Sequence, residues 1–352
     1  MSARGQSSRD WLKIQIIRAL ALPPVRALAR PVYAGEGVIF TLHRVVESPQ
    51  DTLVPGIAIT TAFLEAMIAL IRRSGYDFVP LSEVPARLTG NARRGRWVCL
   101  TFDDGYRDNL TIASPVLTRH GVPYSLFLVS DWVTGARTYN AAVLEQFVLD
   151  HREVTFTHAG VRYAFATNTF AEKMSAYAAI DLMRWRDRTF DAALPSVLLA
   201  QGRSATDVMQ QLFLQSGDVR QIAADGCCEL GSHTRTHPAL AHLPESDARS
   251  ELQDSRAALA TLLGRAPDLI AYPYGSAGQC GPREYQLAEA CGYRVGVTTR
   301  IGNVFRSDAS HPLSLPRTGL SLHPHGHSKE FIVSVLAGSR NALMNRGRRA
   351  RD

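Results

Sequence analysis

Apolar runs alternate with helix-like patterns along most of the chain from Gly37 onward. Short apolar runs bounded by turn residues predict strands, whereas apolar positions that recur at the helical period predict helices. Strands are expected at GVIFTLHRV, RWVCLTFDD, VPYSLFLVS, CCELGSH, DLIAYPY and YRVGVTT, and YDFVPL precedes a short helix. Longer helices are expected at TTAFLEAMIALIRRSG, SDARSELQDSRAALATLLG and PREYQLAEACG, and from Tyr106 to His120. About seven strand–helix repeats predict an α/β fold, either a parallel barrel or a doubly wound sheet.

A mostly helical stretch, from about Gly135 to about Gly226, interrupts this alternation. One part of it, EVTFTHAGVRYAF, predicts a hairpin. We therefore interpret residues 135–226 as an insertion in the α/β domain. At the rim of a barrel, such a segment can be a lid or a wall that selects the substrate, or equally a packing or dimerisation element.

The N-terminal stretch DWLKIQIIRALALPPVRALAR mixes basic and apolar residues. Trp11, Ile14, Ile17 and Leu20 fall at helical spacing, so the helix either lies in a membrane interface or packs on its own domain. No apolar run approaches the roughly 20 residues that a transmembrane helix needs. Asp10 and scattered arginines are atypical of a secretory signal, so a cytoplasmic or membrane-associated protein is expected.

Composition is typical of a globular protein: 352 residues, 45% of them hydrophobic and 20% charged. The 39 basic residues exceed the 32 acidic residues, and the net charge of +7 favours anionic partners. A peripheral membrane contact through the N-terminal segment stays open, and no nucleic-acid partner is expected. The five cysteines are odd in number and lack a C-x-x-C pair, which indicates reduced thiols. Composition does not indicate an oligomeric state.

These patterns divide the chain into three expected segments. Residues 1–36 are a basic amphipathic extension, and residues 37–325 are the α/β domain with its insertion. Residues 326–352 are a C-terminal helix and a basic tail that ends NRGRRARD. The excess of basic residues therefore lies partly at the two ends of the chain.

The run WVCLTFDDGY ends a buried strand on two adjacent carboxylates, Asp103 and Asp104. In a continuing strand these side chains would point to opposite faces, but Gly105 can take backbone angles closed to other residues. The chain can then turn so that both acids reach one cavity; alternatively, Asp104 and Gly105 form only a turn and Asp103 only caps a helix.

Polar side chains also follow the other predicted strands. Reactive groups of a parallel barrel gather at the carboxyl ends of its strands. Those ends carry His43, Asp103, Asp104, Ser232, His233, Tyr274 and Thr298. This ring of polar groups favours an active site over an isolated turn.

The segment GSHTRTHPAL places His233 and His237 four residues apart, so that on one helical turn both imidazoles lie on the same side. Two histidines at this spacing often occur by chance on a protein surface, without a metal. Joined to Asp104, it makes a set of two histidines and one carboxylate with open positions for water and substrate, as in hydrolytic metal centres. Asp103 is then left as the base for the attacking water.

The turn IAYPYGSAG presents a third group. Pro273 fixes its own backbone angle and biases Tyr272 toward an extended one, so Tyr274 stands in a defined way just past a strand. The Tyr274 N–H could face a developing oxyanion, although the same residues also make an ordinary turn.

The motifs TFDDGY, SHTRTH and AYPYG, in this order, resemble the first three motifs of the polysaccharide deacetylase family, the NodB homology domain of carbohydrate esterase family 4. The resemblance covers most of the chain from about Gly37 to about Ser321, apart from the insertion. It implies a distorted (β/α) barrel and metal-dependent removal of N-acetyl, sometimes O-acetyl, groups from sugars such as N-acetylglucosamine. LTFDDGYRDN, VTTR and LPR look most like bacterial members linked to exopolysaccharides or chitooligosaccharides, which implies an acetylated glycan substrate.

The resemblance also implies a role for each matching residue. Asp103 corresponds to the general base, and Asp104, His233 and His237 to the ligands of a divalent ion, usually Zn²⁺. The backbone amide of Tyr274 corresponds to a group that helps to hold the oxyanion.

Two positions depart from the family pattern. Ala271 stands where an arginine often orients the base, and Arg317 in LSLPRTG is the candidate replacement. The tryptophan-bearing fourth motif is not recognisable. A catalytically inactive carbohydrate-binding or scaffold protein on the same barrel is therefore the alternative function. A glycosidase is less favoured, because adjacent carboxylates poorly flank a glycosidic bond, and an iron oxygenase lacks its usual close histidine–acid spacing.

The acid that protonates the leaving amine has two candidate sources. Many family members use a histidine near the end of the domain, where LSLHPHGH offers His323, His325 and His327. His43, in FTLHRV, resembles instead an N-terminal arrangement of some exopolysaccharide deacetylases. We favour His43, because a strand end holds an acid within hydrogen-bond reach better than a tail rich in proline and glycine.

Overall fold

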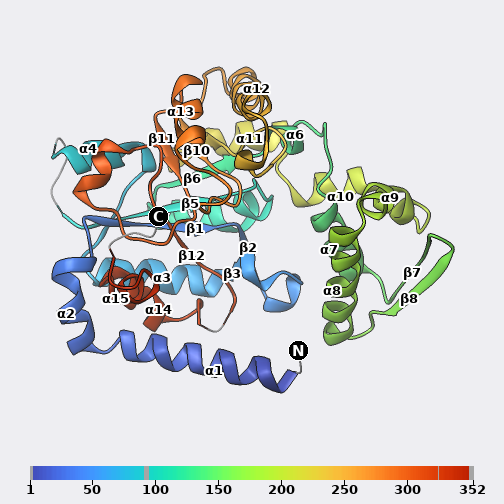
Figure 1. Ribbon diagram of the computed structural model, residues 1–352, viewed down its shortest axis with the longest axis horizontal. Coiled ribbons are helices and arrows are strands. Elements are labelled where there is room, and N and C mark those ends of the chain that lie inside the picture. The colour runs from blue at the N-terminus through green and yellow to red at the C-terminus, as the bar shows by residue number, and fades with distance from the viewer. Residues whose placement is uncertain (1–2, 91–94, 324, 349–352) are drawn as a thin grey trace.

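The computed structural model of the protein describes residues 3–90, 95–323 and 325–348. Its main sheet contains parallel strands in the order β11-β10-β9-β6-β5-β1-β12, and β4 pairs with β5 beside this path (Figure 1). The strands are β1 (Gly37–Leu42), β4 (Asp77–Phe78), β5 (Trp97–Phe102), β6 (Tyr124–Leu128), β9 (Cys228–Ser232), β10 (Leu269–Ala271), β11 (Val295–Val297) and β12 (Thr318–Gly319). The sheet curls into an incomplete barrel, which confirms the expected distorted (β/α) barrel.

Both faces of this sheet are buried, which explains why its strands are almost continuously apolar. Along β1, Val38, Phe40 and Leu42 belong to the core between the sheet and the helices. Ile39 lies instead in the barrel interior, in one cluster with Cys99 of β5 and others. Because β1 and β5 pair in register from Gly37 opposite Trp97, their carboxyl ends lie side by side.

Helices cover the outside of the barrel. The clearest match to the sequence is α3, where the Thr60 hydroxyl caps the helix by accepting a hydrogen bond from the Phe63 N–H. Helices of the barrel are α3 (Thr61–Arg73), α4 (Val84–Thr89), α5 (Ser114–Arg119), α12 (Glu245–Leu263) and α13 (Pro282–Ala290). The helix expected over 106–120 is instead a π-helical turn, Asn109–Ala113, followed by α5. Pro115 lacks the N–H that a continuous α-helix would need there.

The inserted segment forms a lobe beside the barrel, on the right of Figure 1. Its elements are α7 (Asn140–Asp150), β7 (Glu153–His158), β8 (Val161–Ala166), α8 (Phe170–Arg186), α9 (Arg188–Leu199), α10 (Ala205–Leu212) and α11 (Ser216–Ala223). Strands β7 and β8 pair antiparallel, which confirms the predicted hairpin. The lobe has its own apolar core, which includes Phe190 and Phe213 and continues into the barrel through Tyr106 and, in α6 (Ser130–Val133), Trp132.

The two ends of the chain pack together below the barrel. Helices α1 (Ala3–Leu20) and α2 (Pro23–Tyr33) contact α14 (Lys329–Leu336) and α15 (Ser339–Met344). Ile17 is buried in the main core and Leu20 packs against it, so the N-terminal helix does pack on its own domain, while Trp11 stays 62% exposed. None of the described helices has the length and apolar character to span a bilayer. Of the expected basic tail, residues 349–352 lie outside the described part of the chain.

Gly338 provides a test of how firmly the N-terminal extension is docked. It has φ +76°, and a Cβ placed there would lie 2.1 Å from the carbonyl oxygen of Tyr33, at the end of α2. We predict that Gly338→Ala destabilises the protein by two separate costs. An alanine in a left-handed backbone conformation is strained, and the clash of its Cβ with Tyr33 adds an overpacking cost of about 1–3 kcal/mol. The free energy of unfolding in urea measures the effect.

The matched control is Gly264→Ala. Gly264 ends α12 at φ +73°, and no atom lies within 4 Å of an added Cβ. This variant should lose only about 1–2 kcal/mol, the cost of a left-handed alanine. Equal losses in the two variants would show that α2 does not pack tightly against the start of α15.

Candidate active site

A cavity of about 270 Å³ opens at the carboxyl ends of the strands. The residues that line it come from both the barrel and the inserted lobe. They include His43, Asp103, Asp104, Tyr106, His233, His237, Tyr274 and Thr299 from the barrel, and Tyr139, Glu145 and Tyr177 from the lobe. The cavity therefore holds most of the polar side chains that the sequence places at strand ends.

Asp103 and Asp104 both reach this cavity because the chain turns sharply after β5. Asp104 has φ +73° and Gly105 φ +76°, so two consecutive residues are left-handed. A Cβ at Gly105 would lie 2.8 Å from the Leu128 side chain, which explains the glycine. The backbone N–H of Asp103 still donates to Leu42 of β1, at 2.9 Å. The turn thus starts only after the sheet has fixed the backbone position of Asp103.

Arg317 contacts Asp103 through a bidentate ion pair. Its Nη1 and Nη2 atoms lie 2.8 and 2.7 Å from the two carboxylate oxygens of Asp103. The same guanidinium donates to Thr101 Oγ1 at 3.0 Å and to the Thr298 carbonyl at 2.8 Å. Burial alone would raise the pKa of Asp103, but Arg317, with smaller contributions from His233 and His43, holds that pKa well below its usual range. Asp103 is therefore ionised and fixed in orientation.

Asp104 lies against the two imidazoles. Its Oδ1 atom is 3.5 Å from His233 Nε2 and 3.4 Å from His237 Nε2. The segment that carries the histidines is not the helical turn expected from their spacing. It is a loop after β9 in which Thr234 and His237 have φ +64° and +66°. The helical expectation is wrong, yet the loop brings the two rings to a centroid distance of 4.9 Å.

Hydrogen bonds within the loop and from α12 hold this conformation. The Thr234 hydroxyl accepts from the His237 N–H at 3.1 Å. The Glu251 carboxylate of α12 accepts from the backbone N–H groups of Arg235 and Thr236, at 3.0 and 2.8 Å. These bonds satisfy backbone donors that a helix would have paired internally.

The set Asp104, His233 and His237 fits a divalent metal ion. Their ligand atoms all lie within 4.8 Å of one another. His233 Nδ1 is 2.7 Å from the carbonyl oxygen of Ala271 and so donates to it, which directs the lone pair of Nε2 toward Asp104. Burial lowers the pKa of both imidazoles, which favours their neutral, ligating form.

Asp104 supplies the strongest sign that this site suits a cation. Its Oδ1 atom is buried without a hydrogen-bond partner among the described residues. Burial, and then the neighbouring Asp103, raise the pKa of Asp104 well above its usual range. A buried carboxylate oxygen that faces two imidazole nitrogens is a donor set suited to Zn²⁺ or a similar ion.

Tyr274 lines the cavity and, like Asp104 and His237, has a left-handed backbone, with φ +61°. Its carbonyl accepts a hydrogen bond from the Thr299 hydroxyl. Within the described chain, the Tyr274 N–H has no acceptor. Its ring lies 5.0 Å from that of His237 and is 47% exposed. The residue therefore offers both an unused backbone donor and an aromatic face.

The inserted lobe contributes residues that sequence reasoning did not single out. Tyr139 and Tyr177 line the cavity, and Trp132 stacks on Tyr139 with ring centroids 4.6 Å apart. Glu145 of α7 accepts from Thr52 Oγ1 at 2.6 Å, which ties the lobe to the barrel. The signal in the sequence was the position of the insertion, between the strand that ends at Asp103 and the strand that ends at His233, and this signal names no residue.

The two candidate acids lie in different places. His43 lines the cavity at the end of β1, and burial lowers its pKa to about 4, so it is neutral at pH 7. His323 is exposed and is not among the described residues that line the cavity. Its Nε2 lies 3.7 Å from where a Cβ on Gly56 would be. His325 stacks on His323, and His327 Nε2 lies 3.3 Å from Thr60 Oγ1.

Three motifs on the strand ends of a parallel barrel, around a metal-type ligand set, define a class of barrel hydrolases. A family model described as polysaccharide deacetylase matches residues 90–296. The chain belongs to this family.

Individual relatives are distant. YxkH of Bacillus subtilis (strain 168) is 21% identical over 250 residues, which are 71% of this chain and 61% of that protein. The match thus spans less than two thirds of that relative. The Streptococcus pyogenes deacetylase PplD, solved with acetate, aligns at a TM-score of 0.56 and 18% identity over 85% of this chain and 97% of its own. IcaB from Ammonifex degensii aligns at a TM-score of 0.56 and 18% identity, over 88% of this chain and 98% of its own. These structures share the fold.

We predict that the protein binds about one divalent ion per chain at Asp104, His233 and His237, as expected for a two-histidine, one-carboxylate set. Elemental analysis of the purified protein should show that His233→Ala and His237→Ala each lose the ion. His242→Ala is the control, because His242 is an exposed histidine outside this set. Unchanged metal content in both ligand variants would contradict the assignment.

Proposed function

We propose that this protein is a metal-dependent hydrolase that removes acetyl groups from a polysaccharide or oligosaccharide, with N-acetylglucosamine-containing glycans as the substrate class. One observation carries the proposal: the ionised, Arg317-bound carboxylate of Asp103 lies in the same cavity as the Asp104, His233 and His237 set. A base and a metal-type ligand set within one cavity are the minimum needed for amide or ester hydrolysis.

The alternative of an inactive carbohydrate-binding protein rested on Ala271, at the place of the family arginine. Arg317 reaches Asp103 from just before β12 and makes the contacts expected of that arginine. With the base paired in this way, no observation favours an inactive barrel over an enzyme. We propose Arg317 as a positioning residue, because it touches the base and not the reacting atoms.

In the proposed reaction, water attacks the acetyl carbonyl, the carbon–nitrogen bond breaks, and acetate and a free amine leave. The bound ion, which we propose to be Zn²⁺, would polarise the acetyl carbonyl and acidify water. Asp103 accepts the proton of the attacking water. Each carboxylate oxygen has more than one lone pair, so the base can act while it remains bonded to Arg317. The Tyr274 N–H, which has no acceptor among the described residues, would donate to the developing oxyanion.

The departing amine needs a proton, and we propose that His43 delivers it. His43 lies in the cavity with Asp103, and its pKa of about 4 means that it starts the cycle neutral. The proton that it donates must then be acquired during the reaction. Asp103, which takes a proton from water, is the available source, so one proton would pass from water to Asp103, to His43 and to the amine.

The aromatic rings of the lobe suggest how the glycan would be held. Tyr139 and Tyr177 line the cavity beside the barrel motifs, with the Tyr139 ring 6.4 Å from that of His237, and Tyr274 is half-exposed. Sugar rings present apolar C–H faces that pack on aromatic side chains, while their hydroxyls need polar partners. We therefore propose that the insertion is a wall of the substrate site rather than only a packing element.

The activity is tested by acetate release from chitin oligomers, peptidoglycan and acetylated exopolysaccharides. We predict zinc-stimulated release from at least one of them and a loss of at least about a hundredfold in Asp103→Asn, which removes the proton acceptor but keeps the shape. The metal content of the Asp103→Asn variant should equal that of the unaltered protein. Asp77→Asn, at an exposed aspartate of β4, is the control and should keep full activity. Near-normal rates in Asp103→Asn would show that this residue is not the base.

The role of His43 is tested by comparing leaving groups. We predict that His43→Ala lowers kcat on an N-acetylated sugar by about a hundredfold, because the amine must be protonated to leave. On 4-nitrophenyl acetate, whose leaving group needs no proton, the same variant should lose much less. His323→Ala should be near normal on both substrates. If His323→Ala shows the leaving-group dependence and His43→Ala does not, His323 is the acid.

A further inference from the structure

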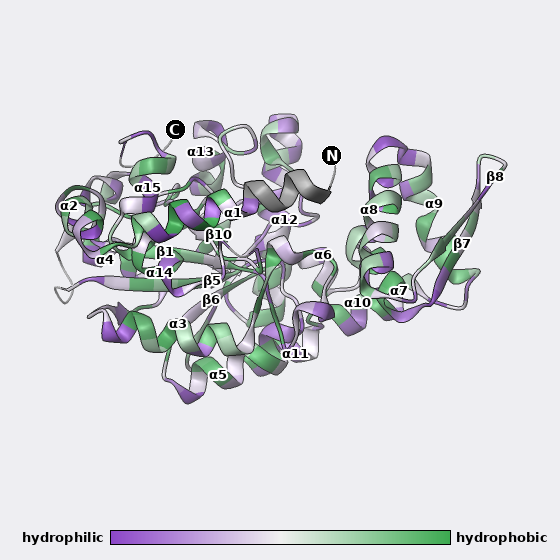
Figure 2. Cartoon of the chain, turned by 90° about the horizontal axis from the view of Figure 1, so that it is seen from below, coloured by the Kyte–Doolittle hydropathy of each residue, from purple (hydrophilic) through white to green (hydrophobic). Residues whose placement is uncertain are grey.

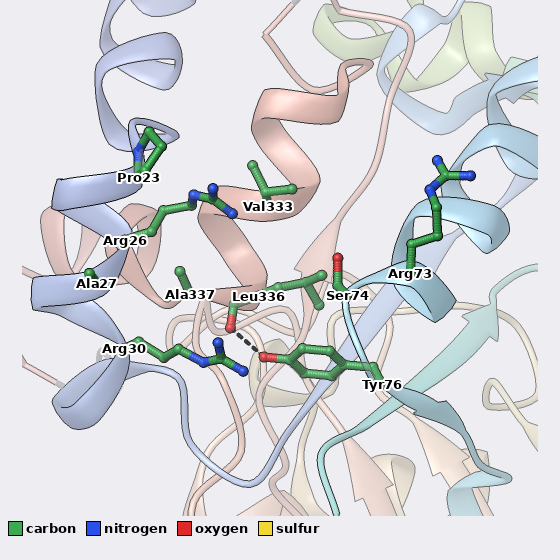
Figure 3. A pocket seen from close by; sticks show the side chains of 10 residues that line it. All are labelled: Pro23, Arg26, Ala27, Arg30, Arg73, Ser74, Tyr76, Val333, Leu336 and Ala337. Atoms are coloured by element: carbon green, nitrogen blue, oxygen red, sulfur yellow. Dashed lines mark hydrogen bonds between the residues drawn. The ribbon is translucent and has the colours of Figure 1, made fainter.

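A second cavity lies between the N-terminal extension and the barrel (Figure 3). It has a volume of about 390 Å³ and lies between α2, the end of α3 and α14. The residues that line it are Pro23, Arg26, Ala27, Arg30, Arg73, Ser74, Tyr76, Val333, Leu336 and Ala337. None of these is acidic, and three are arginines.

The three arginines have no counter-ion within the described chain. Among residues 3–90, 95–323 and 325–348, no carboxylate pairs with Arg26, Arg30 or Arg73. In addition, the Nε atom of Arg26 is buried and has no hydrogen-bond partner there. A buried donor without an acceptor costs free energy unless a ligand supplies one. This is the observation that points to a bound anion.

The other polar groups of the cavity are already occupied. The Tyr76 hydroxyl donates to the Leu336 carbonyl at 2.7 Å, as the dashed line in Figure 3 shows, and the Ser74 hydroxyl donates to Leu70 at 2.8 Å. Arg30 reaches toward Tyr76, and Arg26 points from α2 toward α14. The free donors are therefore guanidinium groups, which match the oxygens of a phosphate in geometry and charge.

This cavity is separate from the candidate active site. Helix α2 ends shortly before β1 begins, and Tyr76 directly precedes β4, so the arginines lie at the amino ends of the parallel strands. Asp103, His233 and Tyr274 follow the carboxyl ends of their strands. The bound anion would therefore not be the acetylated group that reacts.

Exposed apolar side chains also occur on α1, on α2 and on α15. Leu28 of α2 is 80% exposed, and Trp11 of α1 is 62% exposed. The exposed apolar residues of these helices are Trp11, Leu12, Ile16, Leu22, Leu28 and Val32 of the extension, with Leu343 and Met344 of α15. Figure 2, which shows the molecule from below, places α1 across the front with α2 and α15 beside it. Apolar side chains interspersed with arginines are typical of surfaces that lie in a membrane interface.

We propose that the α1–α2 face docks on a bilayer that contains anionic phospholipid, with the phosphate of one headgroup in the Arg26–Arg30–Arg73 cavity. Charge complementarity selects this occupant, because the cavity offers unpaired cations and no acid. The exposed leucines and Trp11 select a lipid as the source of the phosphate, because a free phosphate ion would leave them in water. Docking would hold the α1–α2 face against the surface of a membrane.

Co-sedimentation with vesicles tests the proposal on the full chain. Wild-type protein should bind vesicles of phosphatidylcholine that contain phosphatidylglycerol, bind pure phosphatidylcholine weakly, and lose binding as salt increases. Arg26→Gln with Arg30→Gln should weaken binding to the anionic vesicles on the order of tenfold or more. Acetate release from a soluble glycan should be unchanged in this variant, because neither arginine belongs to the catalytic cavity.

The charge-matched control is Arg220→Gln with Arg265→Gln. Both arginines are exposed, and neither lines the arginine cavity. The control should bind anionic vesicles like wild type. Equal weakening in the two double variants would overturn the site, since it would show only a response to net charge.

Two further arms separate the lipid from other sources of phosphate. Leu28→Ser with Val32→Ser removes exposed apolar contacts and should weaken vesicle binding several-fold while it leaves the unfolding temperature unchanged. Inorganic phosphate should compete only weakly with vesicles. If inorganic phosphate stabilises the wild type through Arg26 while anionic vesicles do not bind, the site takes a soluble phosphate and the membrane proposal is wrong. Equal binding to neutral and anionic vesicles would also overturn it.

Discussion

The buried ion pair between Arg317 and Asp103 is the interaction on which the candidate active site depends. Removing two charges from water is costly, and such a pair is tolerated only when nearly every donor and acceptor is satisfied. Here the guanidinium is fully buried and bonds to Asp103, Thr101 and the Thr298 carbonyl. Thr101 and Asp103 belong to β5 and the turn after it, and Thr298 directly follows β11. Loss of one charge would leave the other unpaired, at a cost of about 3–5 kcal/mol, so the barrel interior and the Asp103 carboxylate are stabilised together.

Two neighbouring carboxylates acquire opposite properties from this arrangement. Asp103 faces the Arg317 cation and has a lowered pKa, whereas burial and the neighbouring Asp103 raise the pKa of Asp104. Separate environments for adjacent acids are a common way to assign separate roles. The left-handed backbone at Asp104, His237 and Tyr274 makes this separation possible. Such conformations cost free energy in non-glycine residues, and they concentrate at sites where surrounding structure maintains them.

The sequence allowed the barrel and the three motifs to be predicted, because apolar periodicity and short turns are local properties. Arg317 could be named as a partner for Asp103, but its distance and bidentate geometry depend on how the sheet closes. The helical reading of His233 and His237 failed because Glu251 of α12, far along the chain, pairs the loop donors. Tyr139 and the cavity around Arg26 depend on tertiary packing of the insertion and of the chain ends. No local pattern marks these residues.

The separation in sequence between Asp103 and Arg317 has a consequence for the order in which the protein is completed. They are 214 residues apart, and a nascent chain leaves the ribosome from its N-terminus. The three family motifs, which end at Gly275, therefore emerge before Arg317, the cation that pairs with Asp103. Until Arg317 arrives, Asp103 must remain in water or take up a proton, because an isolated buried charge is too costly. A translation product that stops before Arg317 contains all three recognised motifs and still lacks the cation that orients Asp103, so the last strand completes the candidate active site.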